Sequence, residues 1–166
     1  MEIFPISLKL QQQRCLIVGG GHIAYRKANL LVKAGAIVDV IAPEIEPDLQ
    51  RLVEKSLGQY VQAPFSESIL TTPYRLVIAA TDQPDVNKTV FEQCEARNLF
   101  VNSVDDIPHC RFMVPAIIDR SPLVISVASN GASPVLSRQI RTQLETNKVT
   151  IEQAEQMALA KGMSSN

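Results

Sequence analysis

Cys15-Leu16-Ile17-Val18-Gly19-Gly20-Gly21-His22-Ile23-Ala24 joins an apolar run to a helical segment through three glycines. Gly19 permits a tight turn, Gly21 lets the backbone approach a pyrophosphate, and Ala24 lets the helix pack closely on the strand. The helix N-terminus favours anions through its free N–H groups and its dipole. The stretch therefore predicts a dinucleotide-binding unit. The alternative is a purely structural turn between a strand and a helix.

The flanking sequence supports the first interpretation, because residues 15–18 read as a strand, 23–34 as an amphipathic helix and Gly35 as its stop. Apolar runs and helical periodicity then alternate along the chain. Strands are predicted over 37–42, 60–62, 74–80 and 99–104. Helices are predicted over 47–57, ended by Gly58, and over 85–97, with Asn98 as a left-handed stop. This alternation is typical of a parallel sheet with helices on both faces. We therefore expect an α/β fold, a Rossmann-type doubly wound parallel sheet.

The pattern changes after Pro108. Two apolar, β-branched runs over 112–118 and 123–128 flank a turn-rich tetrapeptide, and Ser133-Pro134 begins a helix with an apolar stripe at Leu136, Ile140 and Leu144. Two strands cannot bury both their faces, so they extend the sheet or pair with another subunit. We favour pairing and expect a homodimer. Three divisions are predicted: a dinucleotide-binding domain (1–110), a small β-hairpin and helical dimerisation extension (111–146), and a C-terminal segment (147–166). The last segment contains a short helix (151–161) and a polar tail.

Composition narrows the function classes. The 166 residues carry a net charge of −1, which lacks the basic footprint of a nucleic-acid binder. No signal peptide and no apolar run of about 18 residues occurs, so we expect a cytoplasmic protein without membrane contact. The three cysteines form no CxxC pair, which argues against disulfides and structural zinc. His109 invites a metal or acid–base role, but no second histidine stands at ligand spacing, so no metal site is predicted.

Several separate segments together resemble the N-terminal dehydrogenase/chelatase module of siroheme synthases, over about residues 3–146. The segments, in chain order, are Phe4-Pro5-Ile6, Gly19-Gly20-Gly21 with Ala24 and Arg26-Lys27, Ala79-Ala80-Thr81-Asp82, Asn102-Ser103-Val104-Asp105, Phe112-Met113-Val114-Pro115-Ala116 and Ser129-Asn130-Gly131-Ala132-Ser133-Pro134. The resemblance implies NAD-dependent oxidation of precorrin-2, a tetrapyrrole, to sirohydrochlorin. In many members ferrous iron, as a second substrate, is then inserted.

The resemblance also implies roles for individual residues. The proposed catalytic aspartate falls on Asp105, where a carboxylate can accept the protons released by oxidation and by metal insertion. The alternative is a carboxylate that caps a turn. Cofactor contacts are expected from Gly19 and Gly21, from His22 and Ile23 through their main chain, from Pro43 and Glu44 beside the ribose, and from Thr81 and Asn102. NAD is preferred over NADP because no arginine follows the second strand.

An acidic tetrapyrrole requires cations around its pocket. Arg120 and Arg138 are the chosen substrate-binding candidates among four arginines that include Arg111 and Arg141, and Ser129 is a further anchor. The chain has no room for the methyltransferase domain of fused family members, and the helical part of the tetrapyrrole pocket is expected to be reduced, which weakens the case for ferrochelatase activity. The competing class is a non-catalytic NAD-sensing module, which has no need of the segments over 102–105 and 129–134.

Overall fold

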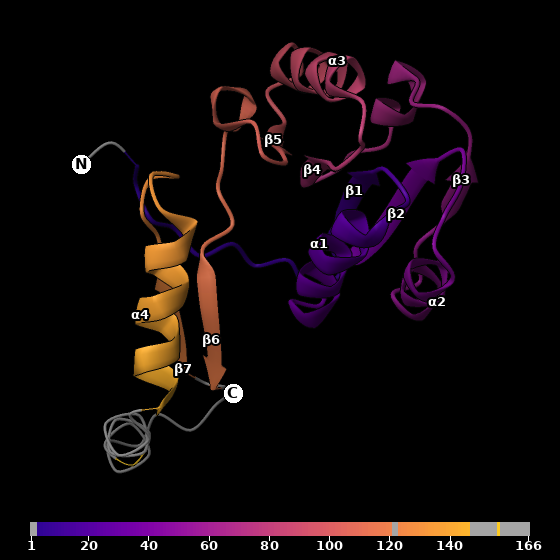
Figure 1. Cartoon of the computed structure of the whole chain (residues 1–166). Helices are drawn as coiled ribbons and strands as arrows, with labels where there is room; N and C mark the ends of the chain where they lie inside the picture. Colours follow the sequence, from indigo (N-terminus) through magenta and orange to yellow (C-terminus); the bar gives the residue numbers. More distant parts are fainter. Residues whose placement is uncertain (1–2, 121–122, 147–155, 157–166) are drawn as a thin grey trace. The chain divides into compact units, whose positions relative to one another are not determined.

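The computed structural model describes residues 3–120, 123–146 and 156. The chain divides into two compact units. One spans Pro5–Phe112, and the other combines Met113–Asn166 with Met1–Phe4. Each unit has its own sheet, and the two are described separately below (Figure 1).

The unit Pro5–Phe112 is built on a five-stranded sheet in which every pairing is parallel. Its strands are β1 (Arg14–Val18), β2 (Ile37–Ala42), β3 (Tyr60–Gln62), β4 (Leu76–Ala79) and β5 (Phe100–Ser103). The strand order is β3-β2-β1-β4-β5. This order, with β1 between the two directions of winding, confirms the predicted Rossmann-type α/β fold.

Helices cover both faces of this sheet (Figure 1). Helices α1 (His22–Lys33) and α2 (Pro47–Lys55) pack over one buried cluster, which includes Ala24 and Leu49. Helix α3 (Pro84–Glu95) packs over a second cluster through Val90 and Cys94. Strands β1, β2 and β4 read as largely apolar runs because both of their faces are buried. Two short 3₁₀ helices complete the unit, η1 (Glu67–Thr71) and η2 (Ile107–His109).

Two of the predicted helix stops lie where expected. Gly35 after α1 and Asn98 after α3 have φ values of 79° and 53°, in the left-handed region that ends helices. Helix α2 is two residues shorter than predicted. Its left-handed residue is Leu57, with φ 62°, and not Gly58.

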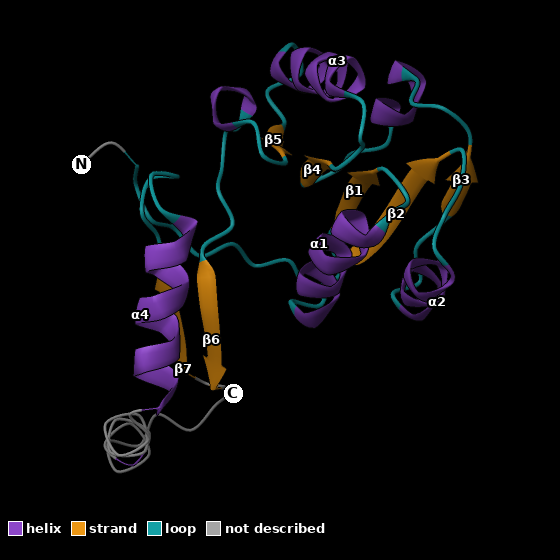
Figure 2. Ribbon diagram, viewed as in Figure 1, coloured by secondary structure: helices purple, strands orange, loops and turns teal. Residues whose placement is uncertain are grey.

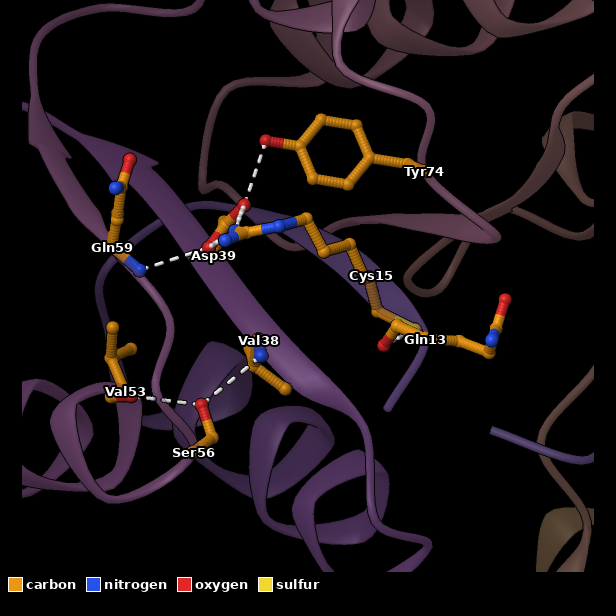
Figure 3. A network of polar contacts seen from close by, with 9 residues as sticks. Gln13, Cys15, Val38, Asp39, Val53, Ser56, Gln59 and Tyr74 are labelled. Carbon is orange, nitrogen blue, oxygen red and sulfur yellow. Dashed lines mark hydrogen bonds and ion pairs between the residues drawn. The ribbon is translucent and has the colours of Figure 1, made fainter. Parts of the chain in front are cut away.

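A buried carboxylate lies in the middle of β2. Asp39 accepts hydrogen bonds from the Tyr74 hydroxyl at 3.1 Å and the Gln59 backbone N–H at 2.9 Å, and Arg14 of β1 forms an ion pair with it. Figure 3 shows Tyr74 and Gln59 converging on Asp39 from different segments. A buried charge is costly unless it is paired and hydrogen-bonded, and these partners meet that requirement.

The second unit holds an antiparallel pair of strands, β6 (Ala116–Arg120) and β7 (Leu123–Val127), packed against helix α4 (Pro134–Thr146) (Figure 2). Strand β6 begins four residues later than predicted and extends through Arg120. The predicted turn over 119–122 is therefore shorter, because Asp119 and Arg120 pair with Val124 and Leu123. The two strands form their own sheet and do not extend the parallel one.

The start of α4 is as predicted, since Ser133 Oγ accepts the N–H of Leu136 at 3.2 Å. The predicted apolar stripe is largely uncovered within this unit. Leu136 and Leu144 are 49% and 36% exposed, whereas Ser137 is buried. Small Ser137 allows the helix to approach β6 and β7 closely. The predicted helix over 151–161 and the tail beyond it lie outside the described residues, apart from residue 156.

Candidate cofactor and active site

The carboxyl ends of parallel strands meet at one edge of a sheet, and ligands of open α/β sheets bind there. The glycine loop follows β1, and Pro43 and Glu44 follow β2. Thr81 lies two residues after β4, Asn102 lies within β5, and Asp105 follows it. The fold therefore brings the predicted cofactor residues and Asp105 to a single edge of the unit Pro5–Phe112.

Two of the three glycines are required by close backbone packing. Gly19 has φ 120°, and a Cβ there would lie 2.4 Å from the Ala80 carbonyl oxygen. A Cβ on Gly20 would lie 1.8 Å from the Glu44 carbonyl oxygen. Sequence reasoning assigned no role to Gly20, because the contact is with a loop 24 positions away and nothing local signals it.

Gly21 differs from its neighbours because a Cβ there would meet nothing within 4 Å. It is the N-cap of α1, makes no side-chain cap, and no acidic residue occupies the first helical turn. The first N–H groups of a helix have no partner within it, so they face the open space beside Gly21. His22 and Ile23 are exposed there. This cradle fits a dinucleotide pyrophosphate, which the main chain of Gly21, His22 and Ile23 would hold.

Thr81 is fixed by a residue that sequence reasoning missed. The Thr81 backbone N–H and hydroxyl lie 3.2 and 2.8 Å from Asn87 Oδ1, and Asn87 Nδ2 donates to the Thr81 carbonyl at 3.0 Å. Asn87 is buried on α3. It shares the helical face of Val90 and Cys94, so an amide on an apolar stripe was the signal available in the sequence.

Asn102 holds the chain as it returns past β5. Its Nδ2 donates to the Phe112 carbonyl at 3.0 Å and lies 3.2 Å from Cys110 Sγ. The Cys110 thiol in turn approaches the Ser103 carbonyl at 3.1 Å, and burial raises its pKa. Within the described residues Asn102 Oδ1 and Ser103 Oγ are buried without a hydrogen-bond partner. The two donor contacts of Asn102 thus fix the chain that follows β5.

Asp105 is exposed in the turn after β5 and has φ 61°, in the left-handed region. Lys27 of α1 interacts electrostatically with it. Burial lowers the pKa of Lys27, and the negative charge of Asp105 opposes that shift. Asp106, the next residue, forms a hydrogen bond with His109, with its Oδ2 atom 2.7 Å from His109 Nδ1. The His109 ring packs edge-on against the Phe91 ring, with 4.9 Å between the ring centroids. His109 is therefore bonded to Asp106 and packed against α3.

The three substrate-binding candidates belong to the second unit. The Ser129 hydroxyl donates to the Ser133 carbonyl at 2.9 Å and accepts the Ser133 N–H at 3.2 Å, closing the turn before α4. Arg120 ends β6 with its side chain exposed, and Arg138 lies on the exposed surface of α4. The structure thus assigns Ser129 a turn-closing role, and the two guanidinium groups are accessible within their own unit.

Across residues 3–120, 123–146 and 156, no three histidine, cysteine, aspartate or glutamate side chains gather as metal ligands do. No helix in the same part of the chain combines the length and apolarity needed to cross a membrane. The thiols of Cys15, Cys94 and Cys110 are free.

A five-stranded parallel sheet with a glycine loop at a helix N-terminus defines a dinucleotide-binding protein. The chain belongs to the putative NAD(P)-binding family, whose model matches residues 6–116. It is 76% identical over 146 residues to a siroheme synthase of Acinetobacter baylyi, and 50% identical over 146 residues to one of Chromobacterium violaceum. These alignments cover 88% of this chain and 32% and 31% of the two proteins, so the chain spans about a third of their length.

A solved structure is also similar. The chain matches the structure described as SirC, precorrin-2 dehydrogenase, with a TM-score of 0.75 and 27% sequence identity. The match covers 87% of this chain and 71% of that one. It confirms the α/β fold.

Proposed function

We propose that this chain oxidises precorrin-2 to sirohydrochlorin, with NAD as hydride acceptor, as a step of siroheme biosynthesis. The observation that carries the proposal is the structural similarity to a precorrin-2 dehydrogenase over 71% of its length. The identity of 76% to a siroheme synthase supports the same substrate class, a tetrapyrrole.

NAD supplies the hydride-accepting ring when bound. The glycine loop and the first turn of α1 would hold its pyrophosphate, because Gly21 leaves room and no acidic side chain competes there. Pro43 and Glu44, at the end of β2, would line the adenosine ribose, and the exposed Glu44 carboxylate would favour a ribose hydroxyl and repel a 2′-phosphate. Thr81 and Asn102 shape the edge of the sheet beyond the glycine loop, toward the nicotinamide.

Oxidation of the macrocycle removes a hydride and a proton. We assign the proton to Asp105, whose exposed carboxylate stands at the carboxyl end of β5 and accepts it as a general base. Lys27 of α1 is the cation that interacts electrostatically with Asp105. The proton then passes to water, and the carboxylate is restored for the next turnover.

The substrate carries many carboxylates, which guanidinium groups bind well in geometry and charge. We assign Arg120 and Arg138 to this role, supported by their exposure within the second unit. Ser129 is a further anchor in the proposal, since its hydroxyl stands at the turn before α4. Iron insertion is a second proposed step, supported by the similarity to siroheme synthases, with ferrous iron as a substrate and Asp105 accepting the displaced pyrrole protons.

A homodimer through the second unit is also part of the proposal. Within the described chain the sheet of that unit has two strands, and Val124, Val135 and Leu136 are exposed apolar residues on it. Two-stranded sheets gain stability by further packing, which a second copy supplies. We place the protein in the cytoplasm, where its free thiols stay reduced.

Anaerobic incubation with precorrin-2 and NAD tests the proposal. We expect the sirohydrochlorin spectrum to develop only when NAD is present, and ferrous iron added afterwards to shift it to that of siroheme. Binding of NAD without any turnover would contradict the proposed oxidation and favour an NAD-sensing module. A strictly monomeric, active protein in light scattering would contradict the dimer.

A further inference from the structure

The ladder between β2 and β3 ends with the pair Ala42–Gln62, the last residues of the two strands, and the hydrogen bond that would come next is not made. Val40 donates its N–H to the Gln59 carbonyl at 2.9 Å, and Ala42 stands opposite Gln62 in the register. A parallel ladder in this register would next bond the N–H of Ala63 to the Ala42 carbonyl. Ala63 instead donates to Val61, at 3.0 Å. The carbonyls at the end of β2 therefore need other donors.

Two side chains of β3 provide those donors. The Tyr60 hydroxyl lies 3.1 Å from the Ala42 carbonyl oxygen and 3.4 Å from that of Pro43. The Gln62 amide donates to the Pro43 carbonyl at 3.2 Å. Tyr60 and Gln62 are two positions apart, so they share one face of the strand. Tyr60 is half-buried against the core cluster beneath α1 and α2, which limits its movement.

The same segment is tied to the glycine loop on its other side. Glu46 donates its backbone N–H to the Gly20 carbonyl at 2.8 Å, and Gly20 has no room for a side chain against the Glu44 carbonyl. The loop over 43–46 is thus held by β3 at one end and by the glycine loop at the other. Any shift of Pro43 and Glu44 would require these contacts to break.

We propose that Tyr60 and Gln62 are positioning residues for the adenosine half of NAD, because they hold the Pro43–Glu44 main chain where the ribose binds. The inference rests on the proposed function for the identity of the cofactor. Neither side chain needs to touch NAD. Loss of their contacts frees the loop at the end of β2, and the bound conformation must then be ordered at a cost in affinity. The nicotinamide end and the proton acceptor Asp105 are not involved.

Two variants test the inference by titration with NAD and with ADP-ribose, which lacks the nicotinamide. Gln62→Ala removes an exposed amide, and Tyr60→Phe removes only a hydroxyl. We expect each variant to raise Kd for both ligands by the same factor, about fivefold, since one net hydrogen bond corresponds to a change of that order. At saturating NAD, kcat with precorrin-2 stays unchanged, so the effect falls on the KM for NAD. Gln50→Ala is the matched control, because the Gln50 amide donates a hydrogen bond to Glu54 on the exposed face of α2.

The outcomes separate this inference from the proposed function. Unchanged Kd values in Gln62→Ala and Tyr60→Phe, beside normal binding by the unaltered chain, overturn the positioning role alone. An equal loss of affinity in Gln50→Ala, or a loss of kcat at saturating NAD, also overturns it. If the unaltered chain binds neither NAD nor ADP-ribose, the proposed cofactor is wrong and the positioning role with it.

Discussion

The guanidinium of Arg14 and the carboxylate of Asp39 form an ion pair between neighbouring strands, with Nη1 at 2.8 and 2.7 Å from the two carboxylate oxygens. The side chain of Asp39 is 5% exposed and that of Arg14 is 36% exposed. The pair lies near the beginning of β1, away from the edge that carries the glycine loop. Its role is therefore in the fold, and the proposed chemistry does not involve it.

Removal of one partner leaves the Asp39 charge under-compensated. Arg14→Ala is expected to lower the free energy of unfolding by about 2 kcal/mol, less than a fully buried pair because Arg14 is part-exposed. Arg51→Ala is the control. Its pair with Asp48 is exposed on both sides, so a loss under about 0.5 kcal/mol is expected. Urea unfolding measures both, and equal losses would contradict the structural role of Asp39.

Alanine substitutions at Gly19 and Gly21 are expected to have contrasting effects. Gly19→Ala places a Cβ 2.4 Å from the Ala80 carbonyl oxygen at φ 120°, so we expect it to destabilise the unit severely. The Cβ of Gly21→Ala meets open space, so the free energy of unfolding of this variant should lie within about 0.5 kcal/mol of that of the unaltered chain. It should nevertheless weaken NAD binding at least about tenfold, because the added methyl occupies the pyrophosphate's approach. Thermal unfolding and NAD titration of the two variants test these expectations. Unimpaired NAD binding by Gly21→Ala would refute the pyrophosphate site at the start of α1.

Asp105→Asn is the sharpest variant of the proposed base. Asparagine tolerates the left-handed φ of 61°, so the fold should be retained, whereas alanine would add backbone strain. We expect unchanged Kd for NAD and a fall in kcat for precorrin-2 oxidation of at least about a hundredfold. Asp106→Asn is the neighbouring control, since its carboxylate pairs with His109. Comparable kcat values for Asp105→Asn and the unaltered chain would remove Asp105 from the mechanism.

Buried thiols make stability fall at high pH. Burial raises the pKa values of Cys15 and Cys94 to about 11. An unfolded thiol titrates near pH 9, so each contribution is fully present below about pH 9 and lost as pH rises toward 11. Urea unfolding should show this decline, with a slope of up to about 1.4 kcal/mol per pH unit for each thiol. The decline should be shallower in Cys94→Ala, and an identical slope in that variant would contradict the assignment.

Local signals predicted the parallel sheet well. Residues 37–42 are a strand as predicted, because a largely apolar run between turn residues has few other stable structures. Residues 60–62 are also a strand as predicted, at the edge of the sheet. The helix stops at Gly35 and Asn98 were also predictable, because glycine and asparagine are the residue types that favour the left-handed conformation at helix ends. Strand β6 was misplaced. The apolar segment before Ala116 links two units and carries no period that separates a linker from a strand.

Contacts between distant segments were the part that sequence could not predict. The clash that fixes Gly20 comes from the Glu44 main chain, and the donors that hold Pro43 come from Tyr60 and Gln62. Such contacts depend on which strands are neighbours, and the spacing of residues does not encode that. Asn87 was an exception that a closer look at the apolar face of α3 would have found.

Stoichiometry tests the central claim most directly. NADH and sirohydrochlorin are recorded together in one anaerobic cuvette that contains the chain, precorrin-2 and excess NAD. Oxidation by NAD predicts that the two products form at equal rates and in equal amounts, because each oxidation transfers one hydride. Sirohydrochlorin that forms without NADH, or no product from a chain that binds NAD, would contradict it.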